Sequence, residues 1–406
     1  MSATTKREPL YRTRPGADAI TAATDAPAVD LGDGIWMSSG LSNSYLLRTS
    51  DGRVIVNCGM GFEGPYHRAA FDAVDPSPTH TIILTQGHPD HLGGVDSFRE
   101  PATRIVTHEN FRIFRDDFER LQTFRQRNSA FAWAAKLQAV FARAGKARHE
   151  LPPQSRPEPT QTFADELELT IGDRRWTLIS TPGGETTDAM VVWLPESRTL
   201  LSGNVLGPLF GHVPNLVTVR GDRYRDALDY VASVDRIRAL KPARMITGHF
   251  DPIEGEDVIE DELRRLRDAT QWVHDRVVEG MNAGTDVHTL MRDVKLPPEL
   301  DVGQGYGKVA WNVRAIWETY AGWFHHRSTT ELYPTPFAAV APDIVQAAGA
   351  GALVAAARSR LAAEPANADA KSAAADAHAA LLAGATNFWE RAWLEKRLAG
   401  LGAGAA

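Results

Sequence analysis

Hydrophobic and polar positions alternate in a way that predicts a β-rich first half of the chain. From residue 35, two apolar segments in GIWMSS and SNSYLLRTSDGRVIVNCG are joined by Ser50-Asp51-Gly52, a turn sequence that indicates a hairpin. A helix is expected at about 64–74, and a long helical stretch is expected over 110–149 until the proline-rich segment 151–161. Further short apolar runs predict strands at 82–84, 104–108, 167–171, 175–180, 190–194 and 245–247, and in the segment TLLSGN.

The pattern changes to helices from residue 256. The segment EDVIEDELRRLRDATQWVHDRVVEGMNAG carries apolar residues at helical spacing, and 337–406 is an alanine-rich helical region typical of helices that pack on each other or on a second subunit. The first thirty residues are polar and lack periodicity. We therefore expect a disordered or extended arm over 1–30, an α/β catalytic domain over 31–255 and a helical dimerisation domain over 256–406.

The stretch TIILTQGHPDHLGGVDSF, residues 81–98, is expected to carry the chemistry. A short apolar strand is followed by three side chains that can bind metal, His88, Asp90 and His91, and then by two glycines. A tight turn after a strand end lets imidazole and carboxylate groups converge on one point, which is how proteins hold zinc and similar ions. The alternative is a solvated loop, against which the preceding strand and the glycine pair both argue.

This string resembles the T-H-x-H-x-D-H-x-G-G signature of the metallo-β-lactamase superfamily, with Gln86 in place of the first histidine. The resemblance implies an αββα sandwich with two metal sites. It assigns the residue at position 86 to the first site, and Asp90 and His91 to the second. His88 is then either a ligand of a depleted first site or a neighbouring group that orients water and moves protons.

Two later segments extend the resemblance. Glu185, in STPGGETTDAM, matches the position at which alkyl sulfatases bind the first metal through a glutamate, although an isolated turn glutamate is usually solvated. His249, in ARMITGHFDPIEG, follows a predicted strand and matches the last ligand of the second metal, with a core histidine as the alternative. Where the family carries an acid that bridges both metals, this alignment places Gly203, followed by Asn204.

A further segment indicates how a substrate is held. The sequence PNLVTVRG resembles the H-N-L-x-T-L-R-G segment of alkyl sulfatases, in which asparagine and arginine hold the sulfate group, and Asn215 and Arg220 match these positions. An arginine fork beside an amide donor suits a tetrahedral anion. The alternative is that Arg220 forms a structural salt bridge. An aromatic stripe at helical spacing predicts helix packing and can also wall a pocket: Phe111, Phe114, Phe118, Leu121 and Phe124.

The helical half resembles the alkylsulfatase dimerisation region, including its G-W-F stretch. The resemblance implies a homodimer. It also places Trp311 where a histidine has been assigned to the active site in that family.

Composition sets the remaining limits. The 406 residues are 43% hydrophobic and 23% charged with a net charge of -7, which gives no basic footprint for nucleic acid. No apolar run is long enough to span a membrane, and the N-terminal stretch has no apolar core of a secretory signal. The single cysteine, Cys58, excludes an intrachain disulfide and indicates a cytoplasmic setting, where it is expected to be a small buried hydrophobe.

Together these features predict a metallo-hydrolase of the alkylsulfatase-like branch. The expected cofactor is a divalent metal, with zinc as the expected ion, at one or two per chain. The expected substrate is a small molecule with a polar or anionic head, such as an amphiphilic sulfate ester. The metal ligands are expected to be His88, Asp90, His91, Glu185 and His249, with Asp90, His88 and Glu185 as the catalytic groups.

Two alternatives stay open. A mononuclear site would also support hydrolysis of a carboxylic ester, lactone, thioester or phosphoester. A catalytically silent relative that binds an anion is the other reading, because Gln86, Gly203 and Trp311 all fall on functional positions of the family.

Overall fold

A computed structural model describes residues 7–144, 151–326, 329–334 and 368–402. The chain divides into two compact units, residues 1–319 and 320–406. The second unit contains two helices that pack against each other, α11 (Ala368–Gly384) and α12 (Phe388–Gly400). These helices were predicted, whereas residues 335–367 of the expected alanine-rich region lie outside the described residues.

The first unit is built on two β-sheets. The seven-stranded sheet runs in chain order, with antiparallel pairing up to β4 and parallel pairing from β4 to β7. The predicted hairpin is present, and Gly52 begins its second strand with φ of 117°. The strands are β1 (Val29–Asp30), β2 (Ile35–Ser38), β3 (Ser44–Thr49), β4 (Gly52–Val56), β5 (Thr79–Ile83), β6 (Arg104–His108) and β7 (Gln161–Phe163).

The six-stranded sheet has the order β13-β12-β11-β10-β9-β8. The neighbours β11 and β12 are parallel, and the other pairs are antiparallel. The strands are β8 (Glu166–Ile171), β9 (Arg174–Ser180), β10 (Met190–Leu194), β11 (Thr199–Gly203), β12 (Arg244–Thr247) and β13 (Ile253–Glu254).

The two sheets face each other across one apolar core. Alternate residues of each strand point inward because side chains on a strand alternate between its faces, so Tyr45 and Leu47 of the first sheet meet Leu178 and Val192 of the second. On the outer face of the first sheet, Phe71 of α1 (Gly64–Asp72) and Phe111 of α3 (Phe111–Arg120) join a second cluster.

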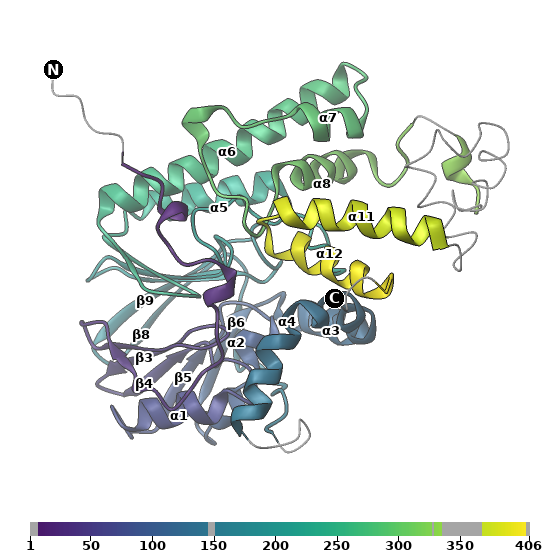
Figure 1. Ribbon diagram of the computed structural model, residues 1–406. Helices are drawn as coiled ribbons and strands as arrows, with labels where there is room; N and C mark the ends of the chain where they lie inside the picture. Colours follow the sequence, from purple (N-terminus) through teal and green to yellow (C-terminus); the bar gives the residue numbers. More distant parts are fainter. Residues whose placement is uncertain (1–6, 145–150, 327–328, 335–367, 403–406) are drawn as a thin grey trace. The chain divides into compact units, whose positions relative to one another are not determined.

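Helices cover both outer faces of the sandwich. In Figure 1, α1 lies on one side of the paired sheets, and α5 (Ala227–Ala239) and α6 (Glu256–Asn282) lie on the other. The helices α5 and α6 pack against each other, and α6 contacts β12 and β13. The predicted αββα sandwich is therefore confirmed.

Two predicted boundaries differ from the structure. The helices α6, α7 (Val287–Asp293) and most of α8 (Val309–Ala321) belong to the first unit, because α6 packs along the sandwich, so the division lies later than residue 255. The predicted helix over 110–149 is split at Leu121 into α3 and α4 (Gln122–Ala144).

The N-terminal segment is described from residue 7. It forms short 3-10 turns at Leu10–Arg12 and Ala17–Ala19. Ile20 and Ala23 are buried, and the backbone N–H of Ala23 donates a hydrogen bond to Glu63. Small and apolar side chains let this segment lie closely on the sandwich without a periodic pattern.

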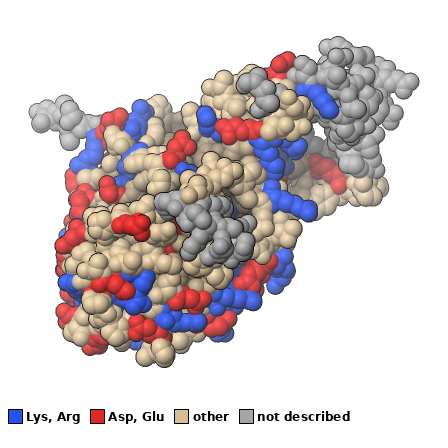
Figure 2. Space-filling view, turned by 60° about the horizontal axis from the view of Figure 1, so that its bottom comes forward, with Lys and Arg blue, Asp and Glu red and all other residues tan. Residues whose placement is uncertain are grey.

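Charge is mixed on the surface. Figure 2 shows acidic and basic side chains interspersed over much of the visible face. Among the described residues, the search for a helix long and apolar enough to cross a membrane finds none. Cys58 is a free and buried thiol, as predicted.

Candidate active site

Four loops bring the candidate residues together. Each loop follows the C-terminal end of a strand: His88 comes after β5, Glu185 after β9, Asn204 directly after β11 and His249 after β12. All four side chains line one cavity. The strand ends fix the backbone on both sheets, so side chains far apart in the sequence meet at one place.

The first cluster surrounds His88. Its Nδ1 lies 3.1 Å from Nε2 of Gln86 and 3.4 Å from Oε2 of Glu185. Burial, assisted by the nearby Arg220 guanidinium, lowers the pKa of His88 to about 3, so its imidazole is neutral. Burial raises the pKa of Glu185, while Arg225, whose Nη2 is 2.9 Å from the carboxylate, favours the ionised form.

The second cluster joins His91 and His249 through an amide. The Nδ2 atom of Asn204 lies 3.1 Å from Nε2 of His91 and 3.2 Å from Nε2 of His249. Oδ2 of Asp90 lies 3.5 Å from the same nitrogen of His91. Burial lowers the pKa of His91, and it lowers the pKa of His249 to about 4, so both rings are neutral and can donate a lone pair.

Gly203 sets the position of Asn204. It has φ of 52°, and a Cβ there would lie 2.6 Å from Oγ1 of Thr85. The pairing register shifts between Leu201 and Gly203, which turns the next side chain into the site. The sequence alignment that placed Gly203 at the position of the family's bridging acid is therefore corrected, because Asn204 carries the side chain that reaches the histidines.

Backbone contacts hold these loops in place. Asn57, with φ of 58°, accepts a hydrogen bond from the backbone N–H of Thr85 at the start of the His88 loop. Asn43 donates from its backbone N–H to the carbonyl of Gly248 and from its amide to the carbonyl of Phe250, on both sides of His249. Such neighbouring contacts orient ligands and limit their rotation.

The geometry can be tested against a metal ion. Bonds of about 2.0–2.1 Å in a tetrahedral site place ligand atoms about 3.3 Å apart. The separations within the two clusters, 3.1–3.5 Å, are of this size. An amide can turn so that its oxygen faces the neighbours, because its nitrogen and oxygen are assigned from the hydrogen bonds.

The ligand set includes an amide. Across the described ranges, no group of three or more His, Cys, Asp or Glu side chains forms a metal-binding arrangement by itself. Beside the predicted trio Asp90, His91 and His249, the amide of Asn204 lies between the two histidines. With the amide oxygen included, two neutral imidazoles and one carboxylate fit a divalent cation.

A cavity of about 250 Å³ adjoins the clusters. Its polar lining includes His88, Asp90, Glu185, Asn204 and His249. Its apolar lining is formed by Leu41, Met60, Phe118, Ala130, Trp133, Leu137 and Pro208. The arrangement suits a molecule with one polar end and one apolar end.

The aromatic stripe has several roles. Phe111 belongs to the core, whereas Phe114 and Phe118 present their rings to His88 at centroid distances of 5.1 and 6.4 Å. Leu121 and Phe124 are exposed. The prediction of helix packing therefore holds for Phe111, and the pocket wall is formed by Phe118.

The two predicted substrate-binding residues differ in their surroundings. Arg220 lines the cavity and also forms a salt bridge, with its Nε 2.8 Å from Oδ2 of Asp222. Asn215 is buried and is not among the residues that line the cavity, and its amide has no hydrogen-bond partner among the described residues. Trp311, at the start of α8, is likewise absent from the described lining.

Three lining residues were missed by the sequence analysis. Arg125 and Lys136 lie on α4, and Tyr306 lies in the loop before α8. No local motif marks them, because they reach the site only through the packing of distant elements.

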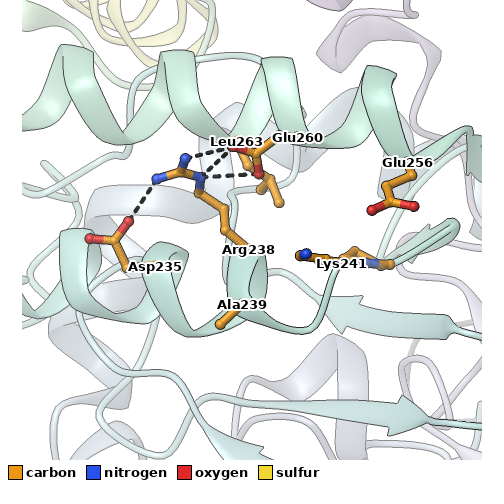
Figure 3. Close-up of a pocket in the computed structure, with 8 residues that line it drawn as sticks. Asp235, Arg238, Ala239, Lys241, Glu256, Glu260 and Leu263 are labelled. Carbon is orange, nitrogen blue, oxygen red and sulfur yellow. Dashed lines mark hydrogen bonds and ion pairs between the residues drawn. The ribbon is translucent and has the colours of Figure 1, made fainter.

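A second hollow, of about 470 Å³, lies between α5 and α6 (Figure 3). Its charges neutralise one another, since Arg238 lies 2.6 Å from Glu260 and 2.9 Å from Asp235. Lys241 and Glu256 also border it. This hollow holds neither histidine nor cysteine, and the metal-type chemistry belongs to the first cavity.

Comparison with known proteins agrees with this geometry. Residues 38–249 match the family model of the metallo-beta-lactamase superfamily, which spans all the strand-end residues described above. The chain belongs to the metallo-beta-lactamase superfamily. Residues 286–368 match the alkyl sulfatase dimerisation family, although 335–367 of that range lie outside the described residues.

The similar curated proteins are sulfatases. The chain is 30% identical over 325 residues to a linear primary-alkylsulfatase of Pseudomonas sp., and the match covers 75% of this chain and 60% of that protein. It is 25% identical over 293 residues to an alkyl/aryl-sulfatase of Saccharomyces cerevisiae, covering 67% and 44% respectively. The chain thus spans less than two thirds of the length of either relative.

A solved structure shares the fold. The stereoselective inverting sec-alkylsulfatase Pisa1 from Pseudomonas sp. has a TM-score of 0.74 at 22% identity, covering 94% of this chain and 66% of that one. At this identity the likeness supports the fold of the superfamily member and leaves its substrate to the site.

Proposed function

We propose that this superfamily member is a metal-dependent hydrolase of sulfate monoesters that carry an apolar organic group. The observation that carries the proposal is a cavity lined both by metal-type ligands and guanidinium groups and by apolar side chains. The similarity to two sulfatases supports the choice of sulfate over other esters.

The metal would be held by the second cluster, through Asp90, His91, His249 and the amide oxygen of Asn204. We propose zinc, because neutral imidazoles with an oxygen ligand suit it, at about one ion per chain. A divalent ion bound there supplies Lewis-acid activation of water and neutralises charge that develops on the ester. The first cluster lacks the family's first histidine, and Glu185 is already paired with Arg225.

The chain's own residues have separate tasks in this proposal. The pKa of Asp90 lies below its usual range although burial opposes this, so its carboxylate is ionised and can accept a hydrogen bond from the attacking water. Glu185 and the neutral imidazole of His88 orient that water from the other side. The apolar walls hold the organic group and exclude bulk water, and Arg220 binds the anionic head.

A substrate panel tests the proposal. Sulfate, phosphate and carboxylic esters with the same alkyl group, together with a lactone, are compared by kcat/KM on protein of measured metal content. We expect the alkyl sulfate to be the best substrate. Preference for a neutral ester or lactone would replace this function with the corresponding hydrolase.

The carboxamides favour one other candidate, a catalytically silent anion-binding relative. Gln86 and Asn204 are neutral where the family resemblance implies a histidine and an acid, which weakens metal binding. Protein that retains no stoichiometric metal and turns over no member of the panel, yet binds sulfate, would support this candidate.

The matched dimerisation family supports a homodimer, and we include this assembly in the proposal. A cytoplasmic setting is also proposed, supported by the use of a single cysteine.

A further inference from the structure

A buried and a largely buried arginine from distant parts of the chain share one carboxylate beside the cavity. Nε of Arg220 lies 2.8 Å from Oδ2 of Asp222, and Nε of Arg125, on α4, lies 3.0 Å from Oδ1 of the same residue. The side chain of Arg220 is 15% exposed, that of Arg125 is 5% exposed and that of Asp222 is 6% exposed. Both arginines line the cavity.

Charged groups of both signs surround the two arginines. Arg225 pairs with Glu185, and Asp90 lines the same cavity, so three guanidinium groups meet three carboxylates. Among these charged groups, only the guanidiniums can donate hydrogen bonds to an anionic head.

The backbone is fitted to bring the two arginines together. Val219 has φ of 33°, which a β-branched residue adopts only when its surroundings impose it. Gly221 has φ of 103°, and a Cβ there would lie 2.4 Å from the ring of Phe124, the neighbour of Arg125 on α4. The loop that carries Arg220 is thus packed directly against the helix that carries Arg125.

The guanidinium of Arg125 is also held from the other side. Its Nη1 donates to the backbone carbonyl of Asp117 at 2.8 Å, and the group lies 5.1 Å from the ring centre of Phe118. No hydrogen bond from its Nη2 is found among the described residues. Nε of Arg220 donates a hydrogen bond to Asp222, and Nε of Arg125 lies at ion-pair distance from the other oxygen of this carboxylate, so Asp222 is a counter-ion to both groups.

We propose that Arg125 and Arg220 act as a pair that binds a tetrahedral oxyanion, the sulfate head of the substrate, with Asp222 as their shared counter-ion. Two guanidinium groups can donate parallel, charge-assisted hydrogen bonds to different oxygens of one such group. The inference rests on the proposed function for the identity of the substrate, and it adds Arg125 as a specificity-determining residue.

Binding of inorganic sulfate tests the pair without turnover. Thermal unfolding of the full chain is followed with low millimolar sodium sulfate against sodium chloride at equal ionic strength, and the dissociation constant is taken from the shift in Tm. Arg125→Gln should weaken sulfate binding by about 10-fold or more, since a charge-assisted bond is lost. Arg125→Lys should retain part of it, because the charge remains without the fork.

Arg223→Gln is the matched control. Arg223 pairs with the carboxylate of Asp117, the residue whose carbonyl holds Arg125, but its side chain is 75% exposed. Arg223→Gln removes one positive charge nearby and should leave sulfate binding at the wild-type level. It also corrects for the general stabilisation that sulfate gives to proteins.

Equal sulfate binding by wild type, Arg125→Gln and Arg223→Gln would overturn the proposal that Arg125 and Arg220 bind sulfate together. If Arg125→Gln does not fold, full wild-type binding by Arg125→Lys would overturn it equally. The proposed function can fail separately from the arginine pair. If Arg125→Gln loses sulfate binding but wild type hydrolyses no alkyl sulfate, the anion site is supported and the hydrolase function is contradicted.

Discussion

At the scale of single residues, two carboxamides determine how much charge the candidate metal centre offers. Gln86 touches His88, and Asn204 lies between His91 and His249. A neutral amide oxygen contributes less to binding a divalent ion than a carboxylate does. The carboxylate of Asp90 then makes the second cluster the stronger of the two, because Glu185 in the first is already neutralised by an arginine.

The difference in charge between the two clusters predicts the metal content of variants. Wild type should retain about one divalent ion per chain after dialysis, and Asp90→Ala and His249→Ala should retain none. Gln86→Ala should leave the metal content unchanged, since loss of a group that only neighbours the ligands typically lowers metal affinity by about 10- to 100-fold. Elemental analysis checks all four proteins. Two ions in wild type, or loss of the ion from Gln86→Ala, would contradict the assignment of a single ion to the second cluster.

Asp188 predicts a pH dependence of stability. Burial raises its pKa from the ordinary 3.8 to about 7, so folding favours the protonated acid. Its stabilising contribution is therefore fully present below about pH 4 and is lost as the pH rises through about 7, at roughly 1.4 kcal/mol per unit of pKa difference.

Asp188→Asn removes this titration at nearly constant volume. Denaturant titrations between pH 4 and 8 give the unfolding free energies of both proteins. The value for wild type should fall relative to that for the variant as the pH rises. A difference that is flat across this range would show that Asp188 does not titrate there.

The residues that sequence predicts well are those fixed by a strand end. His88, Asp90 and His249 line the cavity and His91 lies beside Asn204, because each follows a predicted strand closely. Asn204 was displaced by one position because a register shift in β11 leaves no trace in the hydrophobic pattern. Arg125 could not be found, since its partner Asp222 is remote in sequence and the contact exists only after α4 has packed.

At the scale of elements, one buried carboxylate joins three segments around the cavity. Glu63 accepts hydrogen bonds from the backbone N–H groups of Ala23, Leu41 and Met60 at 2.8–2.9 Å. Leu41 and Met60 line the cavity, and Ala23 belongs to the N-terminal segment. The wall of the pocket therefore depends on a residue at the entrance to α1.

Glu63→Ala should lower the free energy of unfolding by at least about 3 kcal/mol, because three buried donors lose their acceptor at about 1–3 kcal/mol each. Glu168→Ala, at an exposed position of β8, is the control and should change stability by less than about 0.5 kcal/mol. Denaturant titration compares the two. Equal stability of both variants would show that Glu63 does not hold the three segments.

Most elements could be predicted because their patterns are local. The hairpin at Ser50-Asp51-Gly52 and the period-2 strands carry their own signals, and so does the apolar face of α6. The N-terminal segment carries no such pattern, since its buried residues are mostly small and its order comes from contacts such as that of Ala23 with Glu63. Packing of this kind is invisible in one segment alone.

At the scale of the whole molecule, exposed aromatic residues accompany the match to a dimerisation family. Trp323 and Tyr333 are 66% and 67% exposed, whereas Trp317 is buried within its own chain. Exposed apolar surface of this kind marks interaction sites. It supports the proposed homodimer.

Sedimentation should therefore show a dimer for the full chain at micromolar concentration. Trp323→Glu should shift the equilibrium toward monomer, because a buried unpaired charge opposes association. Val29→Glu replaces an exposed apolar residue of the first unit and should leave the dimer intact. A wild-type monomer at this concentration would remove the proposal.

The central claim is that one metal ion at the second cluster drives hydrolysis of an alkyl sulfate. The most direct measurement titrates zinc into chelator-treated protein and follows inorganic sulfate released from octyl sulfate. The account predicts no release without metal, a rise with added zinc, and a plateau at about one equivalent per chain. Release by metal-free protein, no release at any ratio, or a rise that continues to two equivalents would contradict it.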